Sequence, residues 1–138
     1  MRDLLRPILI VAAVALLLVD PGCRRKSESD FTPAQADARK ALESGLRSWK
    51  EGGKPGDVPG TSKPTVRAED PEWSEGRKLK EYEILGDEPL EGSPGRVFTV
   101  RIITDKGAPH EAKYVVFGID PVQVFRDSTY KALSGAGR

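Results

Sequence analysis

The residue types that carry most protein chemistry are scarce in this chain. Its 138 residues include one cysteine, Cys23, and one histidine, His110. A single thiol excludes an intrachain disulfide, and one thiol with one histidine is too few for a zinc finger, a Cys-His nucleophile pair or an iron–sulfur cluster. The formal net charge of +1 argues against a nucleic-acid binder, which would carry a basic stripe. We therefore expect no cofactor, no bound metal and no nucleic-acid partner.

The remaining candidates for acid–base chemistry are His110 and two tyrosines. His110 follows a predicted hairpin turn and is expected to be a solvated loop residue. Tyr82 and Tyr114 fall on predicted strands, where a tyrosine packs and its hydroxyl finds one partner. The acidic residues at 69–72 and 87–88 fall in turns, where carboxylates cap and are solvated, so no inward carboxylate is expected beside the tyrosines. The pattern predicts no catalytic residue.

The position of Cys23 is more informative than its chemistry. An uninterrupted apolar run covers residues 8–19, with Arg2 and Arg6 before it. The run is too short for a bilayer-spanning helix of about 20 residues, but it fits the core of an export signal. A polar stretch follows the cysteine. The pattern predicts a signal peptide over 1–22 and a polar tether over 23–31.

This arrangement resembles the bacterial lipoprotein signal, in which a small residue precedes a cysteine that is lipidated and becomes the new N-terminus. Gly22 matches the small residue, whereas Asp20 stands where an apolar residue is usual. The resemblance implies lipid attachment at Cys23 and a domain held at the bacterial cell envelope, facing the periplasm or the exterior. Two alternatives remain open: an uncleaved N-terminal anchor, and ordinary secretion with a different cleavage site.

The rest of the chain is predicted to be one α+β domain over 32–130. An amphipathic helix is expected over about 33–50, with Thr32 as its N-cap. A crossing loop rich in glycine and proline follows at 52–64. A single helical turn capped by Asp70 is expected to insert Trp73 into the core.

The second half of the domain is strand-like. Runs of β-branched and aromatic residues with short turns predict strands at 78–85, 96–104, 111–119 and 122–126. The fold class is therefore α+β, with one long N-terminal helix packed on a curved four-stranded antiparallel meander. Residues 131–138 are predicted to form a flexible tail.

This order of elements resembles the cystatin-like and nuclear-transport-factor-two-like α+β fold over about 32–127. The likeness rests on the element order, on the cluster of Asp70, Trp73, Gly76 and Leu79, and on residues 122–127. The resemblance implies a cone between helix and sheet, whose candidate ligand-binding residues are Leu46, Trp49, Tyr82, Phe98 and Tyr114. Members of this superfamily include dehydratases, isomerases, small-molecule binders and non-catalytic envelope domains, so the fold does not decide the function.

We therefore expect a membrane-tethered envelope lipoprotein whose domain is a non-enzymatic binding or interaction module. Its expected partners are membrane lipid through Cys23, and either a second copy bound through the open sheet face or another envelope protein. One alternative is a small dehydratase- or isomerase-like enzyme that uses the cone, which would require two titratable side chains to meet inside it. The other alternative is an N-terminally anchored membrane protein.

Overall fold

The structure is a computed structural model that describes residues 32–135. The predicted signal segment 1–22, the tether with Cys23 and the last three residues lie outside the described residues. In chain order the elements are α1 (Gln35–Lys50), β1 (Gly56–Asp57), β2 (Val66–Glu69), α2 (Pro71–Ser74), β3 (Leu79–Pro89), β4 (Arg96–Thr104), β5 (His110–Phe117), β6 (Val122–Arg126) and α3 (Asp127–Gly135).

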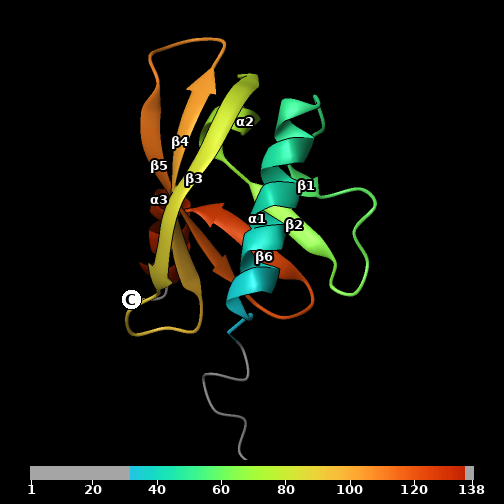
Figure 1. The fold of residues 1–138 in the computed structure, drawn as a ribbon, viewed down its shortest axis with the longest axis vertical. Coiled ribbons are helices and arrows are strands. Elements are labelled where there is room, and N and C mark those ends of the chain that lie inside the picture. The colour runs from blue at the N-terminus through green and yellow to red at the C-terminus, as the bar shows by residue number, and fades with distance from the viewer. Residues whose placement is uncertain (1–31, 136–138) are drawn as a thin grey trace, which may run out of the picture.

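The predicted N-terminal helix is present as α1, but it begins later than expected. Ala34 occupies the N-cap position and makes no side-chain cap bond, so the predicted start with a Thr32 cap is wrong. The end of the helix agrees with the sequence, because Gly52 adopts a positive φ of 85° and its N–H donates to the Trp49 carbonyl. One face of α1 is buried against the sheet (Figure 1).

The sheet has six strands in the order β1-β2-β6-β5-β4-β3. Strands β3 to β6 form the predicted antiparallel meander. The predicted turn after residue 85 is wrong, because β3 continues to Pro89, which lies opposite Arg96, and so places Asp87 and Glu88 in the strand. The expectation of four strands is incomplete, because β2 adds to β6 in parallel and β1 pairs antiparallel with β2. Strand β2 has four residues and β1 has two, which is too short for a period-2 pattern to be recognised.

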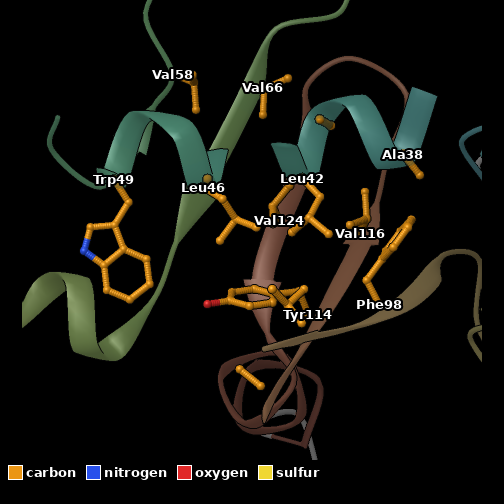
Figure 2. Close-up of a cluster of buried hydrophobic side chains, with 14 of the residues drawn as sticks. Ala38, Leu42, Leu46, Trp49, Val58, Val66, Phe98, Tyr114, Val116 and Val124 are labelled. Atoms are coloured by element: carbon orange, nitrogen blue, oxygen red, sulfur yellow. The ribbon is translucent and has the colours of Figure 1, made fainter. Parts of the chain in front are cut away.

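The core lies between α1 and the facing side of the sheet (Figure 2). Helix residues spaced three and four apart point onto the side chains of β4, β5 and β6. Alternate residues of β4 and β5, among them Phe98, Val100, Tyr114 and Val116, are buried on the side of the sheet that faces α1. The larger core side chains are Leu42, Leu46, Trp49, Val58, Val66, Trp73, Leu79, Phe98, Val100, Ile102, Tyr114, Val116, Val122 and Val124.

The opposite face of the sheet is partly covered by α3. The Phe117 ring lies 5.7 Å from the Phe125 ring and 5.2 Å from the Tyr130 ring, measured between centroids. Phe125 and Val115, which lie beneath α3, are buried. Composition predicts a flexible tail from Lys131, whereas the described chain is helical through Gly135.

The short helix α2 forms as the sequence predicts. The Asp70 side chain caps it, and Pro71 occupies the first helical turn. Trp73 is buried, as expected, and the Gly76 N–H donates to the Trp73 carbonyl at 3.0 Å where the turn closes. This turn places two acidic side chains, Asp70 and Glu72, beside the ends of β5 and β6.

Candidate functional site

The five residues predicted to line a cone lie in or against the hydrophobic core. Leu46, Trp49, Phe98 and Tyr114 are at most 3% exposed, and Tyr82 is partly buried against them. Leu46, Trp49 and Tyr114 share one small cavity of about 10 Å³, which Tyr82 and Phe98 do not line. That volume holds at most about one water molecule. The described conformation therefore leaves no room there for an organic ligand, and the binding role of these residues stays a prediction.

Two tryptophans wall this cavity and are held by the backbone. The Trp49 and Trp73 rings stack with centroids 5.8 Å apart and an interplanar angle of 16°. Trp49 Nε1 donates to the Arg77 carbonyl at 2.7 Å, and Trp73 Nε1 donates to the Gly53 carbonyl at 2.8 Å. Because each indole N–H already has a partner, these rings join α1, α2 and the start of β3.

A buried carboxylate lies beside Tyr114, contrary to expectation. Asp70 is 2% exposed, and its Oδ1 accepts from the backbone N–H of Glu72 at 2.7 Å. Its Oδ2 accepts from the Tyr114 hydroxyl at 2.6 Å and from Arg126 Nε at 2.9 Å. The expectation that this acidic turn is solvated, with no carboxylate near the tyrosines, is wrong for Asp70.

A second carboxylate extends this network to the surface. Glu72 Oε2 accepts from Arg126 Nη2 at 2.8 Å and lies 3.1 Å from His110 Nε2, while Oε1 accepts from Arg77 Nη1 at 3.0 Å. His110 Nδ1 lies 3.0 Å from the Ala108 carbonyl oxygen. His110 is the first residue of β5 and contacts Glu72, so the expectation of a solvated loop residue is wrong. We define the polar cluster as Asp70, Glu72, Arg77, His110, Tyr114 and Arg126.

Three members of the polar cluster, Tyr114, Arg126 and Glu72, have shifted pKa values. Burial, and then the negative charge of Asp70, raise the pKa of the Tyr114 phenol well above its ordinary value. Burial opposes the charge of Arg126, but the surrounding acceptors outweigh it and raise the pKa of its guanidinium. Burial would also raise the pKa of Glu72, but hydrogen bonds from Arg126 and His110 hold that pKa below its ordinary value. Tyr114 is therefore a hydrogen-bond donor, not a base.

The sequence did signal one member of the polar cluster. Asp70 before Pro71 and Trp73 is an N-cap pattern, and the capping role is confirmed. Its partners Tyr114 and Arg126 lie 44 and 56 positions away. They meet Asp70 because β2 pairs in parallel with β6, which no local pattern indicates.

A larger hollow lies between α1 and the loop that follows it. The helix and the segment 58–64 enclose two adjoining spaces of about 510 and 280 Å³. The spaces share Ser44, Gly60 and Thr61 in their walls, so they form one continuous depression, which we name the α1 groove. Its α1 side consists of Asp37, Lys40, Ala41, Ser44, Arg47, Ser48 and Glu51.

The loop wall of the α1 groove is held by side-chain hydrogen bonds. The Thr61 hydroxyl donates to the Val58 carbonyl at 2.7 Å and accepts from the Val66 N–H at 3.1 Å. Asp120 Oδ1 accepts from the Thr65 N–H at 3.1 Å, which ties the end of the loop to the β5–β6 turn. The groove is therefore formed before any ligand arrives. The sequence shows this segment only as a crossing loop.

Within residues 32–135, no group of three or more histidine, cysteine, aspartate or glutamate side chains is arranged to hold a metal ion. In the same part of the chain, no helix has the length and apolar character needed to cross a bilayer. No family model, curated protein or solved structure matches the chain.

Proposed function

We propose that this protein is a lipid-anchored bacterial envelope protein whose α+β domain is a non-catalytic binding or interaction module. The observation that carries the proposal is the placement of Cys23. It stands between an apolar run with preceding arginines and a strongly polar stretch, with Gly22 directly before it. Two or more acyl chains on this residue would make membrane attachment stable, at about 0.8 kcal/mol for each buried methylene.

The small interior space of the domain favours binding at the surface instead. The space beside Asp70 and Tyr114 has a volume of about 10 Å³, and each of these side chains is engaged in hydrogen bonds. A ligand-sized hollow lies instead along the α1 groove, whose larger space of about 510 Å³ is within the usual range for binding sites. The likeness of the helix-on-sheet arrangement to the cystatin-like fold remains part of this proposal.

An enzyme is the second candidate, and one observation favours it. Asp70 and Tyr114 are two titratable side chains that meet between helix and sheet, as a cone-pocket dehydratase or isomerase would require. Such an enzyme must open this space to admit its substrate. Trp49 and Trp73 are the only tryptophans of the chain, and both line the space, so their fluorescence reports its opening.

Acrylamide quenching separates these two candidates. Because both indoles are at most 7% exposed, we expect weak quenching in the native protein and strong quenching after unfolding in guanidinium. Native quenching close to the unfolded value would show that the space opens readily, and would favour the enzyme. Free N-acetyltryptophanamide in the same buffers calibrates full exposure.

The anchor is tested by intact-mass spectrometry of the protein purified from its native membrane fraction. We expect a chain that begins at Cys23 and carries diacylglyceryl mass, and a Cys23→Ser variant that lacks both changes. A Ser27→Ala variant, changed just beyond the cysteine, should be processed like the wild type. An unprocessed chain that begins at Met1 would overturn the lipoprotein proposal and favour the uncleaved anchor.

A further inference from the structure

The charged side chains of the α1 groove lack partners in the described domain. Lys40, Arg47 and Lys63 are exposed, and none of them forms an ion pair with another residue of 32–135. Elsewhere on α1, by contrast, Arg39 Nε lies 3.2 Å from Glu43 Oε1. The groove therefore presents three cations that form no ion pair among the described residues.

These cations occupy the middle of the groove. Lys40 and Arg47 are two helical turns apart on one side of α1, and Lys63 lies on the loop opposite. The groove's two carboxylates, Asp37 on α1 and Glu51 at the C-cap of that helix, lie at its ends. Seven residues of helix place Lys40 and Arg47 about 10 Å apart along the axis. A ligand lying along the groove thus meets positive charge at its centre and negative charge at both ends.

We propose that the α1 groove binds an extended, carboxylate-bearing segment of a partner protein. The inference rests on the proposed function, since it specifies what the binding module recognises. In a polyproline-II segment, carboxylates three residues apart lie on one side at a spacing of about 9 Å, which matches Lys40 and Arg47. The groove is open along its length, and its cations are exposed, so it suits a segment lying along α1 more than a single enclosed anion.

The rigidity of the loop wall lowers the entropic cost of this binding. Thr61 and Asp120 already hold the backbone at Val58, Thr65 and Val66. On this side of the interface, the lysine and arginine side chains remain to be ordered when the segment binds. Because these cations are exposed, the interaction is expected to weaken as salt is added.

The direct test uses full-length protein in detergent and a fluorescein-labelled, capped proline-rich peptide with two glutamates three residues apart. Fluorescence anisotropy measures its Kd. The same peptide with both glutamates replaced by glutamine is expected to bind about tenfold more weakly. Lys40→Gln and Arg47→Gln are each expected to weaken binding of the glutamate peptide about threefold, which is typical of one exposed ion pair.

Lys50→Gln is the matched control, because Lys50 is exposed on α1 but does not line the groove. It should leave the Kd unchanged, and circular dichroism should show that all variants are folded. Equal binding of the two peptides, equal loss in Lys50→Gln, or no binding of the glutamate peptide would each overturn the inference.

Anionic lipid is the other surface these cations could meet. The test adds vesicles of phosphatidylglycerol to the Cys23→Ser protein. If the vesicles bind through Lys40 and Arg47 and the glutamate peptide does not bind, the groove contacts the membrane and the inference is overturned. Failure of the groove inference leaves the lipid anchor untouched, since the mass of the Cys23 modification decides that proposal independently.

Discussion

At the residue scale, Asp70 links three parts of the domain through one carboxylate. Oδ1 caps α2, while Oδ2 accepts from the Tyr114 hydroxyl and pairs with Arg126 at the end of β6. Asp70 is buried, and the Arg126 side chain is only 15% exposed. Water therefore cannot fully solvate either charge if the other is removed. Breaking one half of such a buried pair is costly because the other charge stays buried.

We therefore predict that Asp70→Asn destabilises the domain by about 3 kcal/mol, measured by urea unfolding at neutral pH. The amide keeps an oxygen for the helix cap but removes the negative charge that faces Arg126. Asp57→Asn makes the same chemical change at an exposed position of β1 and should change stability by less than about 0.5 kcal/mol. Similar small effects of both variants would contradict a structural role for the pair.

Glu72 makes the stability of the domain depend on acid. Its pKa is held below the ordinary value by Arg126 and His110, against the effect of burial. The unfolded chain therefore binds the proton at a higher pH than the folded chain does. The stabilisation is present above the unfolded pKa and is lost as pH falls through the folded pKa.

We predict that the free energy of unfolding falls between about pH 5 and pH 3, and that Glu72→Gln makes this fall shallower. Asp87 and Asp105 also have lowered pKa values, so some acid dependence remains in the variant. The measurement is a series of urea titrations across this pH range. Glu91→Gln, the same change at an exposed position outside the polar cluster, is the control, and a Glu72→Gln slope equal to wild type would contradict the prediction.

At the scale of elements, α1 lies unusually close to β2. A Cβ built on Gly45 would lie 2.7 Å from the Ala68 Cβ, and both atoms belong to rigid elements. We predict that Gly45→Ala destabilises the domain by about 1–2 kcal/mol, because overpacking outweighs the gain of about 1 kcal/mol in helix propensity.

A second substitution checks the cause of that effect. Ala68→Gly removes the facing Cβ, so Gly45→Ala should cost less in the Ala68→Gly background than in the wild type. Chemical unfolding of the four proteins of this double-mutant cycle measures the coupling. Additive effects of the two substitutions would show that the contact between α1 and β2 is not the cause.

The elements differ in how far local sequence predicts them. Helix α1, the capped turn α2 and the strands β3 to β6 have clear periodicity or capping residues, and they form. Strand β2 has four residues between proline-containing turns, and it is defined by its parallel pairing with β6 rather than by its own pattern. The polar cluster follows from that pairing, which explains why its first member was predictable as a cap while the contacts with Tyr114 and Arg126 were not.

At the scale of the whole molecule, the two faces of the sheet are covered unequally. Helix α1 buries one face, whereas α3 covers part of the other and buries none of its own residues. The contact of Tyr130 with Phe117 holds α3 over the buried Val115 and Phe125. The rest of that face carries charged side chains on β3, β4 and β5, including Glu83, Arg101 and Lys113.

This coverage predicts the oligomeric state. With α3 in place, the apolar strip formed by Val115, Phe117 and Phe125 is covered, so a soluble chain lacking residues 1–23 should be a monomer by light scattering. Tyr130→Glu should release α3 and expose the apolar strip beneath it, because the ring that packs against Phe117 is replaced by an ionised side chain. We expect faster amide hydrogen exchange across α3 and a rise in the molar mass from light scattering as the protein concentration increases. Ser128→Glu, an exposed position in the first turn of the same helix, should leave both measurements unchanged. A wild-type dimer would show that the outer face binds a second copy even with α3 docked, and an unchanged monomer in Tyr130→Glu would show that other contacts hold this helix.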